Sequence, residues 1–443
     1  MNKTLILALD IGTSSVRASL YDGSANAIPR AFAKIERSLK VTPDGGSEID
    51  AEVALKQVVS AIDSVLKKST KLKREISYVA SCSFWHSLVG VDANNKPTTK
   101  VFGWADTRSG KYTESLRKRF DEAETHNRTG ARFHSSYWPA KLLWLRKESP
   151  DVFAKTTRWL SFSDYVALRL FNEEVTSVSM ASGTGIFDIR KCLWDQELLN
   201  FLKVKPSNLP QIADHDSKTF VLNKTFAKRW SRLANAKWFP AIGDGAADNI
   251  GAGCVTREKA ALMIGTSGAM RVAYMGEPPK KIPGGLWCYR IDRKRVIIGG
   301  ALSDGGNLFA WLKKNLKLPN DSELQIAKRK HGEHGLTFLP FLHGERSTGY
   351  SESTKGAIIG LTASHDSVDI LQAALESVAY RFAEIFAQLN KVTKIKEIVG
   401  SGGALRDSPV WTQIIADAID RELTMNSAPE SSSRGVVLFA LEH

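Results

Sequence analysis

The 443-residue chain contains few cysteines, and their spacing excludes two common classes of stabilising site. Its four cysteines, Cys82, Cys192, Cys254 and Cys288, are scattered, and none forms a CxxC pair. Zinc sites and disulfide frameworks depend on close, recurring cysteine spacings. We therefore expect four reduced thiols, most of them buried.

Long apolar runs are also missing. No apolar stretch approaches the ~20 residues that are needed to cross a bilayer. The N-terminal "MNKTLILALDIG" contains Asp10 and lacks a small-residue cleavage site, so it is not typical of a signal peptide. We expect a buried strand here, in a cytoplasmic protein without a membrane partner.

The sequence has neither a GxxxxGK[ST] loop nor a GxGxxG strand–helix motif, so a nucleotide would need another cradle. Its net charge is +14, but the basic residues are dispersed, and we expect no nucleic-acid partner. A positive field does favour anionic small molecules, such as nucleotides or a sugar acid.

The length predicts more than one domain. Strands and helices alternate in both halves, which indicates an α/β architecture. Expected strands cover Leu5–Ile11, 16–21 and 295–301; expected helices cover 50–67, 110–124, 138–147 and Ser367–Leu389; loops are expected at 180–188 and around Asn208.

One strand–turn–strand unit occurs twice, as "LALDIGTSSVRASLYD" from Leu7 and as "ALMIGTSGAMRVAYMG" from Ala261. Only the first copy carries an acid, Asp10. Turns rich in glycine and hydroxyl groups expose backbone N–H groups that bind phosphate. Ordinary β-hairpins use the same residues, so each turn alone leaves both interpretations open. The repeat suggests two similar domains that face each other across a cleft.

Two further segments combine small residues with polar ones. In "GSGGALRDSP", three glycines would let the backbone approach a ligand before a helix N-terminus, although a plain connector is equally compatible. In "AIGDGAADNIGAGC", Asp244 and Asp248 lie among glycines and alanines. A carboxylate there could accept a proton from a hydroxyl, or could cap a helix.

Taken in order, these segments resemble the FGGY family of carbohydrate kinases, within the actin-like, hexokinase and Hsp70 superfamily. The resemblance rests on "DIGTSSVR", "WADTR", "GDGAADNIGAG", "IGTSG", "GGALSDGGNLFAWL", "PFLHGERSTGY" and "GSGGALRDSPVW". Among the branches, the gluconate kinases are most similar, through "FWHSLVGVD", "TGARFHSSYWPAKLLWLRKESPDVF" and "MASGTGIFDIRKCLWD". The resemblance implies two duplicated actin-like, ribonuclease H-like domains, residues 1–253 and 254–443, with an ATP cleft between them.

The resemblance also implies residue roles. Asp244 would be the catalytic base, with Gly245 beside it, and Asp10 would face Mg²⁺. Residues expected near the phosphates or the nucleotide are Thr13, Ser14, Ser15, Arg17, Gly265, Thr266, Gly306, Gly402, Gly403 and Asp407. Residues expected near the sugar are Trp85, His86, Trp104, Asp106, Arg108 and His134. For the two tryptophans, core packing is an equally good explanation.

The implied function is ATP- and Mg²⁺-dependent phosphorylation of a small sugar or sugar acid, gluconate first, by a monomer or homodimer. Arg108, Arg132 and His86 would suit a carboxylate. The alternatives are a xylulose or ribulose kinase and, in another class, an actin-like ATPase without sugar kinase activity; "WADTR" and "GDGAADN" argue against the latter. Members of the family that the chain resembles usually continue beyond "RGVVLFALEH". The resemblance therefore leaves open that the second domain is truncated here, or that "LEH" begins a tag.

Overall fold

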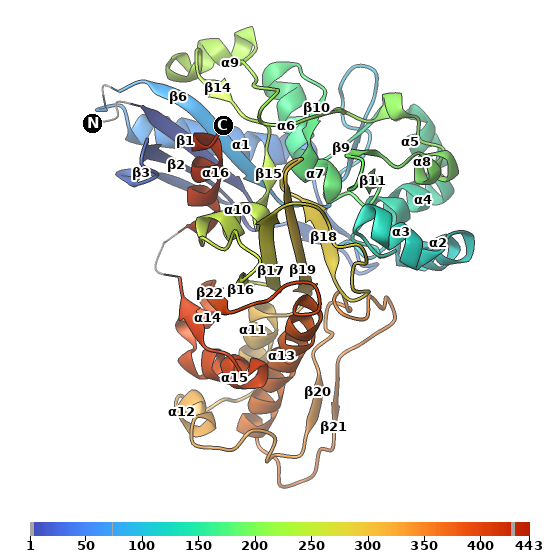
Figure 1. Cartoon of the computed structure of the whole chain (residues 1–443), viewed down its shortest axis with the longest axis vertical. Helices are drawn as coiled ribbons and strands as arrows, with labels where there is room; N and C mark the ends of the chain where they lie inside the picture. Colours follow the sequence, from blue (N-terminus) through green and yellow to red (C-terminus); the bar gives the residue numbers. More distant parts are fainter. Residues whose placement is uncertain (1–3, 73, 427–429) are drawn as a thin grey trace.

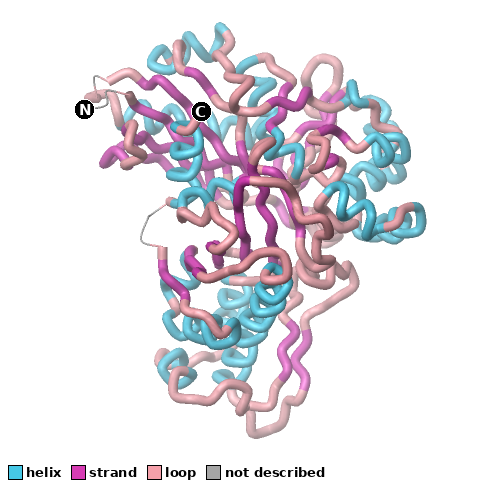
Figure 2. The backbone as a smooth tube through the Cα atoms, in the orientation of Figure 1, coloured by secondary structure: helices cyan, strands magenta, loops and turns pink. Residues whose placement is uncertain are grey.

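The computed structural model describes residues 4–72, 74–426 and 430–443. Figure 1 shows two lobes, each built on its own β-sheet, with both ends of the chain in the first lobe. The strands of each sheet and the helices around them are distinguished in Figure 2. The α/β architecture expected from the sequence is confirmed.

The first sheet is centred on β1 (Leu5–Ile11), which pairs antiparallel with β2 (Ser15–Asp22) and parallel with β6 (Ile76–Ser83). Its order is β14-β6-β1-β2-β3, with β15 also on β6. The added strands are β3 (Ala27–Glu36), β14 (Lys237–Trp238) and β15 (Ile242–Gly243). Every residue of β1 is buried, which explains its nearly continuous apolar sequence.

The second sheet repeats this arrangement. β16 (Lys259–Ile264) pairs antiparallel with β17 (Gly268–Met275) and parallel with β22 (Glu397–Ser401). The full order is β18-β19-β17-β16-β22-β23, which adds β18 (Trp287–Arg290), β19 (Arg295–Leu302) and β23 (Leu423–Met425). The duplication predicted from the two turns is therefore present in the strand pairing itself.

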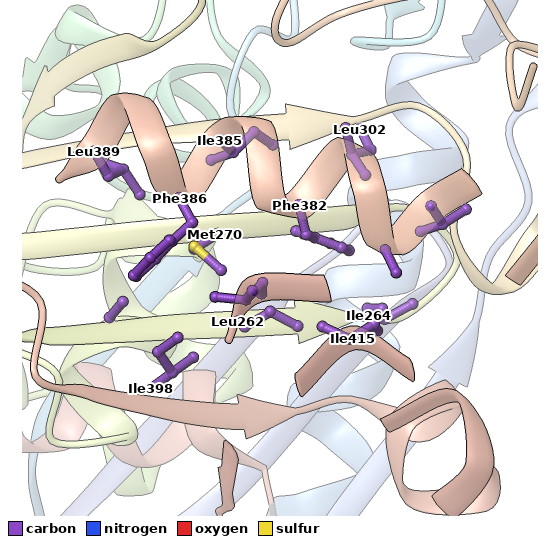
Figure 3. Packing of buried hydrophobic residues seen from close by; sticks show 14 of the residues in the cluster. Leu262, Ile264, Met270, Leu302, Phe382, Ile385, Phe386, Leu389, Ile398 and Ile415 are labelled. Atoms are coloured by element: carbon purple, nitrogen blue, oxygen red, sulfur yellow. The ribbon is translucent and has the colours of Figure 1, made fainter. Parts of the chain in front are cut away.

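The core of the second lobe forms where α13 (Ser367–Leu389) crosses this sheet. Figure 3 shows Phe382, Ile385, Phe386 and Leu389 of the helix facing strand residues that include Met270. Burying a side chain of this size contributes about 1.5–3 kcal/mol. Asp366 caps the helix by accepting from the N–H groups of residues 368 and 369, which fixes its first turn.

The remaining elements surround the two sheets. In the first lobe the helices are α1 (Ala51–Lys68), α2 (Thr113–Arg119), α3 (Glu122–Thr129), α4 (Trp138–Glu148), α5 (Pro150–Lys155), α6 (Phe162–Phe171), α7 (Val178–Ser182), α8 (Gln196–Leu202), α9 (Lys224–Arg229) and α10 (Asp244–Gly251). The helices that come later in the chain are α11 (Gly306–Asn315), α12 (Ser322–Ile326), α14 (Gly403–Asp407), α15 (Pro409–Ile419) and α16 (Ser431–Leu441). Short 3₁₀ turns cover Gly110–Tyr112, Pro206–Asn208 and Ser231–Leu233.

Small sheets join loops around the lobes. They pair β4 (Lys40–Val41) with β5 (Ser47–Ile49) and β8 (Val101–Phe102), β7 (Val89–Val91) with β9 (Arg158–Leu160), β10 (Val175–Ser177) with β13 (Gln211–Ala213), β11 (Phe187–Asp188) with β12 (Leu193–Trp194), and β20 (Thr337–Leu339) with β21 (Ala357–Ile359).

Three local predictions differ from the structure. The single helix expected over 110–124 is divided, because Asp121 caps a new helix by accepting from Glu124 N–H at 3.0 Å. The loop expected over 180–188 begins with part of α7, whose cap is Ser177. Near Asn208, the expected loop also contains the short strand β13.

The last helix, α16, returns to the first lobe. It packs on α10 and beside β1 and β6, and in Figure 1 it lies next to the first sheet although it ends the chain. The two helix backbones approach closely at glycines. A Cβ at Gly251 would lie 1.8 Å from Ser431 O, and a Cβ at Gly435 would lie 1.8 Å from Ala247 O.

Within residues 4–72, 74–426 and 430–443, no helix is both long and apolar enough to span a membrane. All four cysteines are free and buried, as predicted.

The α10–α16 crossing should be sensitive to a single methyl group. We expect Gly435→Ala to lower the free energy of unfolding by about 1–3 kcal/mol, because the added carbon has no space. The matched control is Gly403→Ala, where a Cβ would meet no atom within 4 Å. Chemical denaturation of both variants checks this; equal stability would contradict the close approach.

Candidate active site

Two cavities meet between the lobes. The first, here called the cleft cavity, has a volume of about 300 Å³ and is lined by Asp10 and Arg17, which flank the first Gly-Thr-Ser turn, and by Gly265 of the second. The second, the aromatic cavity, has a volume of about 90 Å³ and is lined from the first lobe by residues such as Trp85 and from the second by residues of β17, β18 and β19. Asp244, Met263 and Arg271 line both. A wider groove of about 850 Å³ along α15 contains none of the expected site residues.

Hydrogen bonds within the first lobe hold the backbone of the first Gly-Thr-Ser turn. Gly12 N–H donates to Ser15 O at 2.9 Å, and the buried Arg37 donates through Nη1 to Gly12 O at 3.2 Å. Burial lowers the pKa of Arg37 to about 10. Sequence reasoning missed this supporting residue, because nothing in the local pattern of β3 distinguishes it from a surface arginine.

Asp10 is the acid of this turn. It is 5% exposed and lines the cleft cavity. Oδ2 accepts from Arg17 Nη1 at 2.9 Å, across the β1–β2 pair, and Oδ1 lies 3.5 Å from the Cys82 thiol. Met263 occupies the position before the second turn that Asp10 occupies before the first. Of these two equivalent positions, only the one in the first lobe therefore carries a carboxylate.

The second turn is completed by glycines from other segments. Gly265 N–H donates to Ser267 O at 3.0 Å, and Gly306 N–H donates to Gly265 O at 2.9 Å. A Cβ at Gly306 would lie 2.3 Å from that oxygen. Gly402 has a φ of +99°, and its Cβ would lie 2.2 Å from Ile264 O, whereas Gly403 faces open space. Together they leave exposed backbone beside the cleft cavity.

Asp244 is the first residue of α10 and lies at the junction of the cavities. One of its oxygens accepts from Gly245 N–H at 2.8 Å. Burial raises the pKa of Asp244 to about 6, partly offset by the guanidinium of Arg271, and the charge of Asp10 raises it further. A carboxylate with such a pKa can hold a proton transiently near neutral pH.

Trp85 forms a wall of the aromatic cavity. Its indole fits against glycines, because Cβ atoms at Gly183, Gly243 and Gly245 would lie 1.9–2.8 Å from the ring. Its Nε1 donates to Ser179 O at 3.0 Å. Trp85 is therefore packed in the core and also lines the aromatic cavity, so a contact with the sugar stays a prediction.

His86 presents a neutral nitrogen to the same cavity. Nδ1 lies 2.5 Å from Gly183 O and must carry the proton, since a carbonyl only accepts. Burial and then the charge of Arg346 hold the pKa of His86 well below its ordinary value. Its φ is +67°, a strained conformation for a non-glycine residue and typical of a functional position.

Arg346 supplies a cation that sequence reasoning missed. Its guanidinium lies 5.1 Å from the centre of the Trp104 ring, and Nη2 lies 3.4 Å from His86 Nε2. Both Arg346 and Trp104 line the aromatic cavity. Within the described part of the chain, Arg346 forms no ion pair with a carboxylate. Arg346 is the arginine of "PFLHGERSTGY", a segment that indicates the family but does not by itself indicate a role for this side chain.

Arg108 and Arg132, the arginines expected at the sugar, pair with carboxylates in this structure. Arg108 pairs with Glu48 and with Asp106, each at 2.6 Å, and Arg132 pairs with Glu122 at 2.9 Å. Asp106 and His134 are buried but do not line the aromatic cavity. Burial lowers the pKa of His134 to about 3. These residues stabilise the surrounding loops in this structure.

Several expected nucleotide residues also lie outside the cleft cavity. Ser14, Thr266 and Asp407 are exposed, Thr13 is half-buried and Ser15 is buried. Of all the expected site residues, the ones that line the cleft cavity are Asp10, Arg17, Asp244, Gly245, Gly265, Gly402 and Gly403.

Comparison with known proteins agrees with this geometry. The N-terminal domain of the FGGY family of carbohydrate kinases matches residues 5–251, and its C-terminal domain matches residues 260–442. The chain belongs to the FGGY family of carbohydrate kinases. An actin-like ATPase without sugar kinase activity is thereby set aside. Carbohydrate kinases of this family use ATP.

Similar proteins carry two kinds of name. Gluconokinase of Bacillus subtilis is 28% identical over 98% of this chain and 87% of its own length. Two solved structures from Lactobacillus acidophilus, a gluconate kinase and a xylulose kinase, are each 27% identical with a TM-score of 0.89. They cover 99% of this chain and 88% and 89% of their own lengths. The reaction class is thus fixed more firmly than the sugar.

The raised pKa of Asp244 predicts a pH dependence for this FGGY kinase. The ionised carboxylate is the form able to take a proton, and it predominates above the pKa of about 6. We therefore expect kcat/KM to fall about tenfold for each pH unit below that value. Initial rates between pH 4.5 and 8 check this. A flat profile down to pH 5 would contradict it.

Proposed function

We propose that this FGGY kinase transfers the γ-phosphoryl group of Mg-ATP to a sugar acid, D-gluconate foremost, giving 6-phosphogluconate. The observation that carries the proposal is the position of Asp244, where the cleft cavity opens into the aromatic cavity. A base at this junction can reach a hydroxyl on one side and a phosphate on the other.

ATP fits the cleft cavity. Gly306 and Gly402 bring backbone against the second turn without a Cβ, and Gly403 leaves space in front of it. Backbone N–H groups in such turns bind phosphate. We propose that Thr13, Ser14, Ser15, Arg17, Gly265, Thr266 and Asp407 also approach the nucleotide when the lobes close, since closure excludes water from such sites.

Mg²⁺ also fits. The lining of the cleft cavity includes four carboxylates, those of Asp10, Asp244, Asp248 and Glu430, and three guanidinium groups, those of Arg17, Arg271 and Arg406. A polyphosphate would face a net negative lining unless a cation came with it. Asp10 would hold Mg²⁺, which takes one or two carboxylates plus phosphate oxygens and water. When bound, Mg²⁺ neutralises charge on the β- and γ-phosphates.

In the proposed reaction one bond to the γ-phosphorus forms, another breaks, and Asp244 takes up the proton that is released. The substrate hydroxyl oxygen forms a bond to the γ-phosphorus, and the bond from that phosphorus to the β–γ bridging oxygen breaks. The hydroxyl proton passes to the Asp244 carboxylate. Gly245 N–H keeps that carboxylate in place by its 2.8 Å hydrogen bond.

An acidic acceptor is favoured by charge. Arg346 lines the aromatic cavity and has no carboxylate partner among the described residues, and the nearby His86 is neutral. A guanidinium pairs with a carboxylate through two parallel hydrogen bonds. The name of the Bacillus subtilis relative supports gluconate. The second candidate is a ketopentose, favoured by the likeness to a xylulose kinase.

Trp85 and Trp104 would pack against the carbon chain of the acceptor, and His86 would accept from one of its hydroxyls. We propose Asp106, Arg108 and His134 only as supports of this pocket. The division at residues 253/254, a cytoplasmic location and a monomer or homodimer stay predictions.

The role of the base can be tested directly. We expect Asp244→Asn to lower kcat by about 10²-fold or more, because the amide cannot take the proton. Binding of ADP, measured by calorimetry, should change little. If the variant turns over near the wild-type rate, Asp244 is not the base.

The acceptor is tested by comparing sugars. We expect kcat/KM for D-gluconate to exceed that for D-xylulose and D-ribulose at least tenfold. Leaving Arg346 unpaired beside a neutral sugar costs roughly 1–3 kcal/mol, or about 5- to 150-fold. Arg346→Gln should remove most of this preference, whereas Arg132→Gln, outside the cavity, should keep it. Equal turnover of a neutral ketopentose by the wild type would overturn the choice of gluconate.

A further inference from the structure

Arg271 lies where the two cavities join and comes from the opposite lobe to the base. It is on β17 of the second sheet, and its Nη2 donates to Asp248 of α10 at 2.7 Å. The backbone is held as well, because Asn249 Nδ2 donates to Arg271 O at 3.3 Å. Its side chain is 6% exposed. The guanidinium is therefore fixed across the junction of the lobes.

Most of its donors remain unused. A guanidinium has five N–H groups, and within the described part of the chain only Nη2 has a side-chain partner. Nε is buried without any hydrogen-bond partner there. Burying such donors unpaired is costly, which indicates that a ligand completes them.

The Nη1 nitrogen of Arg271 lies beside the first turn of α10, the helix that begins with Asp244. A Cβ at Gly245 would lie 2.4 Å from Arg271 Nη1, so this nitrogen lies against the residue that follows Asp244. Of these two cavities, Arg17 and Arg406 line the cleft cavity but not the aromatic one, and Arg346 lines the aromatic cavity but not the cleft. Of the arginines in the described ranges, Arg271 is the one that lines both.

We propose that Arg271 is a catalytic residue that contacts the phosphoryl group during its transfer. The group must move from the cleft cavity toward a hydroxyl beside Asp244, and Arg271 borders that path. In the transition state, negative charge spreads over the three equatorial oxygens of the phosphorus, and a planar guanidinium can bond two of them. This proposal rests on the kinase reaction of the family and not on gluconate as the acceptor.

Recognition of the substrate carboxylate is a less suitable role for Arg271. In gluconate the phosphorylated hydroxyl and the carboxylate are at opposite ends of the carbon chain. With the hydroxyl at Asp244, the carboxylate lies at the far end of the carbon chain, and Arg346, which also lines the aromatic cavity and has no carboxylate partner among the described residues, is the better candidate to bind it.

The guanidinium of Arg271 also counters the effect of burial on the pKa of Asp244, which keeps the base ionised.

The test removes the guanidinium without leaving a buried charge behind. The double variant Arg271→Ala/Asp248→Asn is compared with Asp248→Asn alone, with wild type as reference and with both D-gluconate and D-xylulose as acceptors. We expect kcat to be about 10³-fold lower in the double variant than in Asp248→Asn. The acid limb of the pH profile should move to higher pH, and added guanidinium chloride should restore part of the rate.

A transition-state analogue separates catalysis from folding and binding. In wild type, ADP with aluminium fluoride and the sugar should raise the melting temperature more than ADP and sugar alone. The double variant should keep the shift with ADP and lose the additional one. Loss of the shift with ADP itself, or a kcat within fivefold of Asp248→Asn, would overturn the proposal. So would a defect seen with D-gluconate but not with D-xylulose, which would make Arg271 a carboxylate site.

Discussion

The close crossing of α10 and α16 is the contact on which the rest of the site depends. Backbone atoms of the two helices meet at Gly251 and Gly435, where no Cβ fits. The contact ties the last helix of the chain to the first sheet and fixes the axis of α10. Because Asp244 is the first residue of α10, this packing places its carboxylate where it lines both cavities.

The site is built from groups that face each other across the lobes. The first lobe supplies the carboxylates of Asp10 and Asp244, and the second supplies Arg271, Arg346 and the glycine-rich backbone. Each group is held by a neighbour of its own lobe or by one strong contact across the junction. Such an arrangement brings opposite charges from the two lobes together at the cavities.

The duplicated turn shows how one backbone motif serves two purposes. Both copies have the same antiparallel hairpin, with a parallel strand on its other side. The first places Asp10 beside Arg17 and Cys82, whereas the second has Met263 at that level. A second carboxylate would add to a lining that already has more acids than guanidinium groups. An apolar residue there leaves the phosphate-binding backbone without further repulsion.

The sequence by itself determined the local structure and the family. Apolar β1, the capped and amphipathic α13 and the repeated Gly-Thr-Ser turns are encoded within short segments, so their elements follow from neighbouring residues. Asp10 was predicted because it lies in such a segment, and Asp244 and the glycines because they lie in the short small-residue segments "AIGDGAADNIGAGC" and "GSGGALRDSP". Only the tertiary structure decided which cations are available. Arg108 and Arg132 are neutralised by Glu48, Asp106 and Glu122, whereas Arg346 and Arg271 reach the cavities from distant strands and loops. Charge pairing acts through space between residues far apart in the chain, and local patterns carry no record of it.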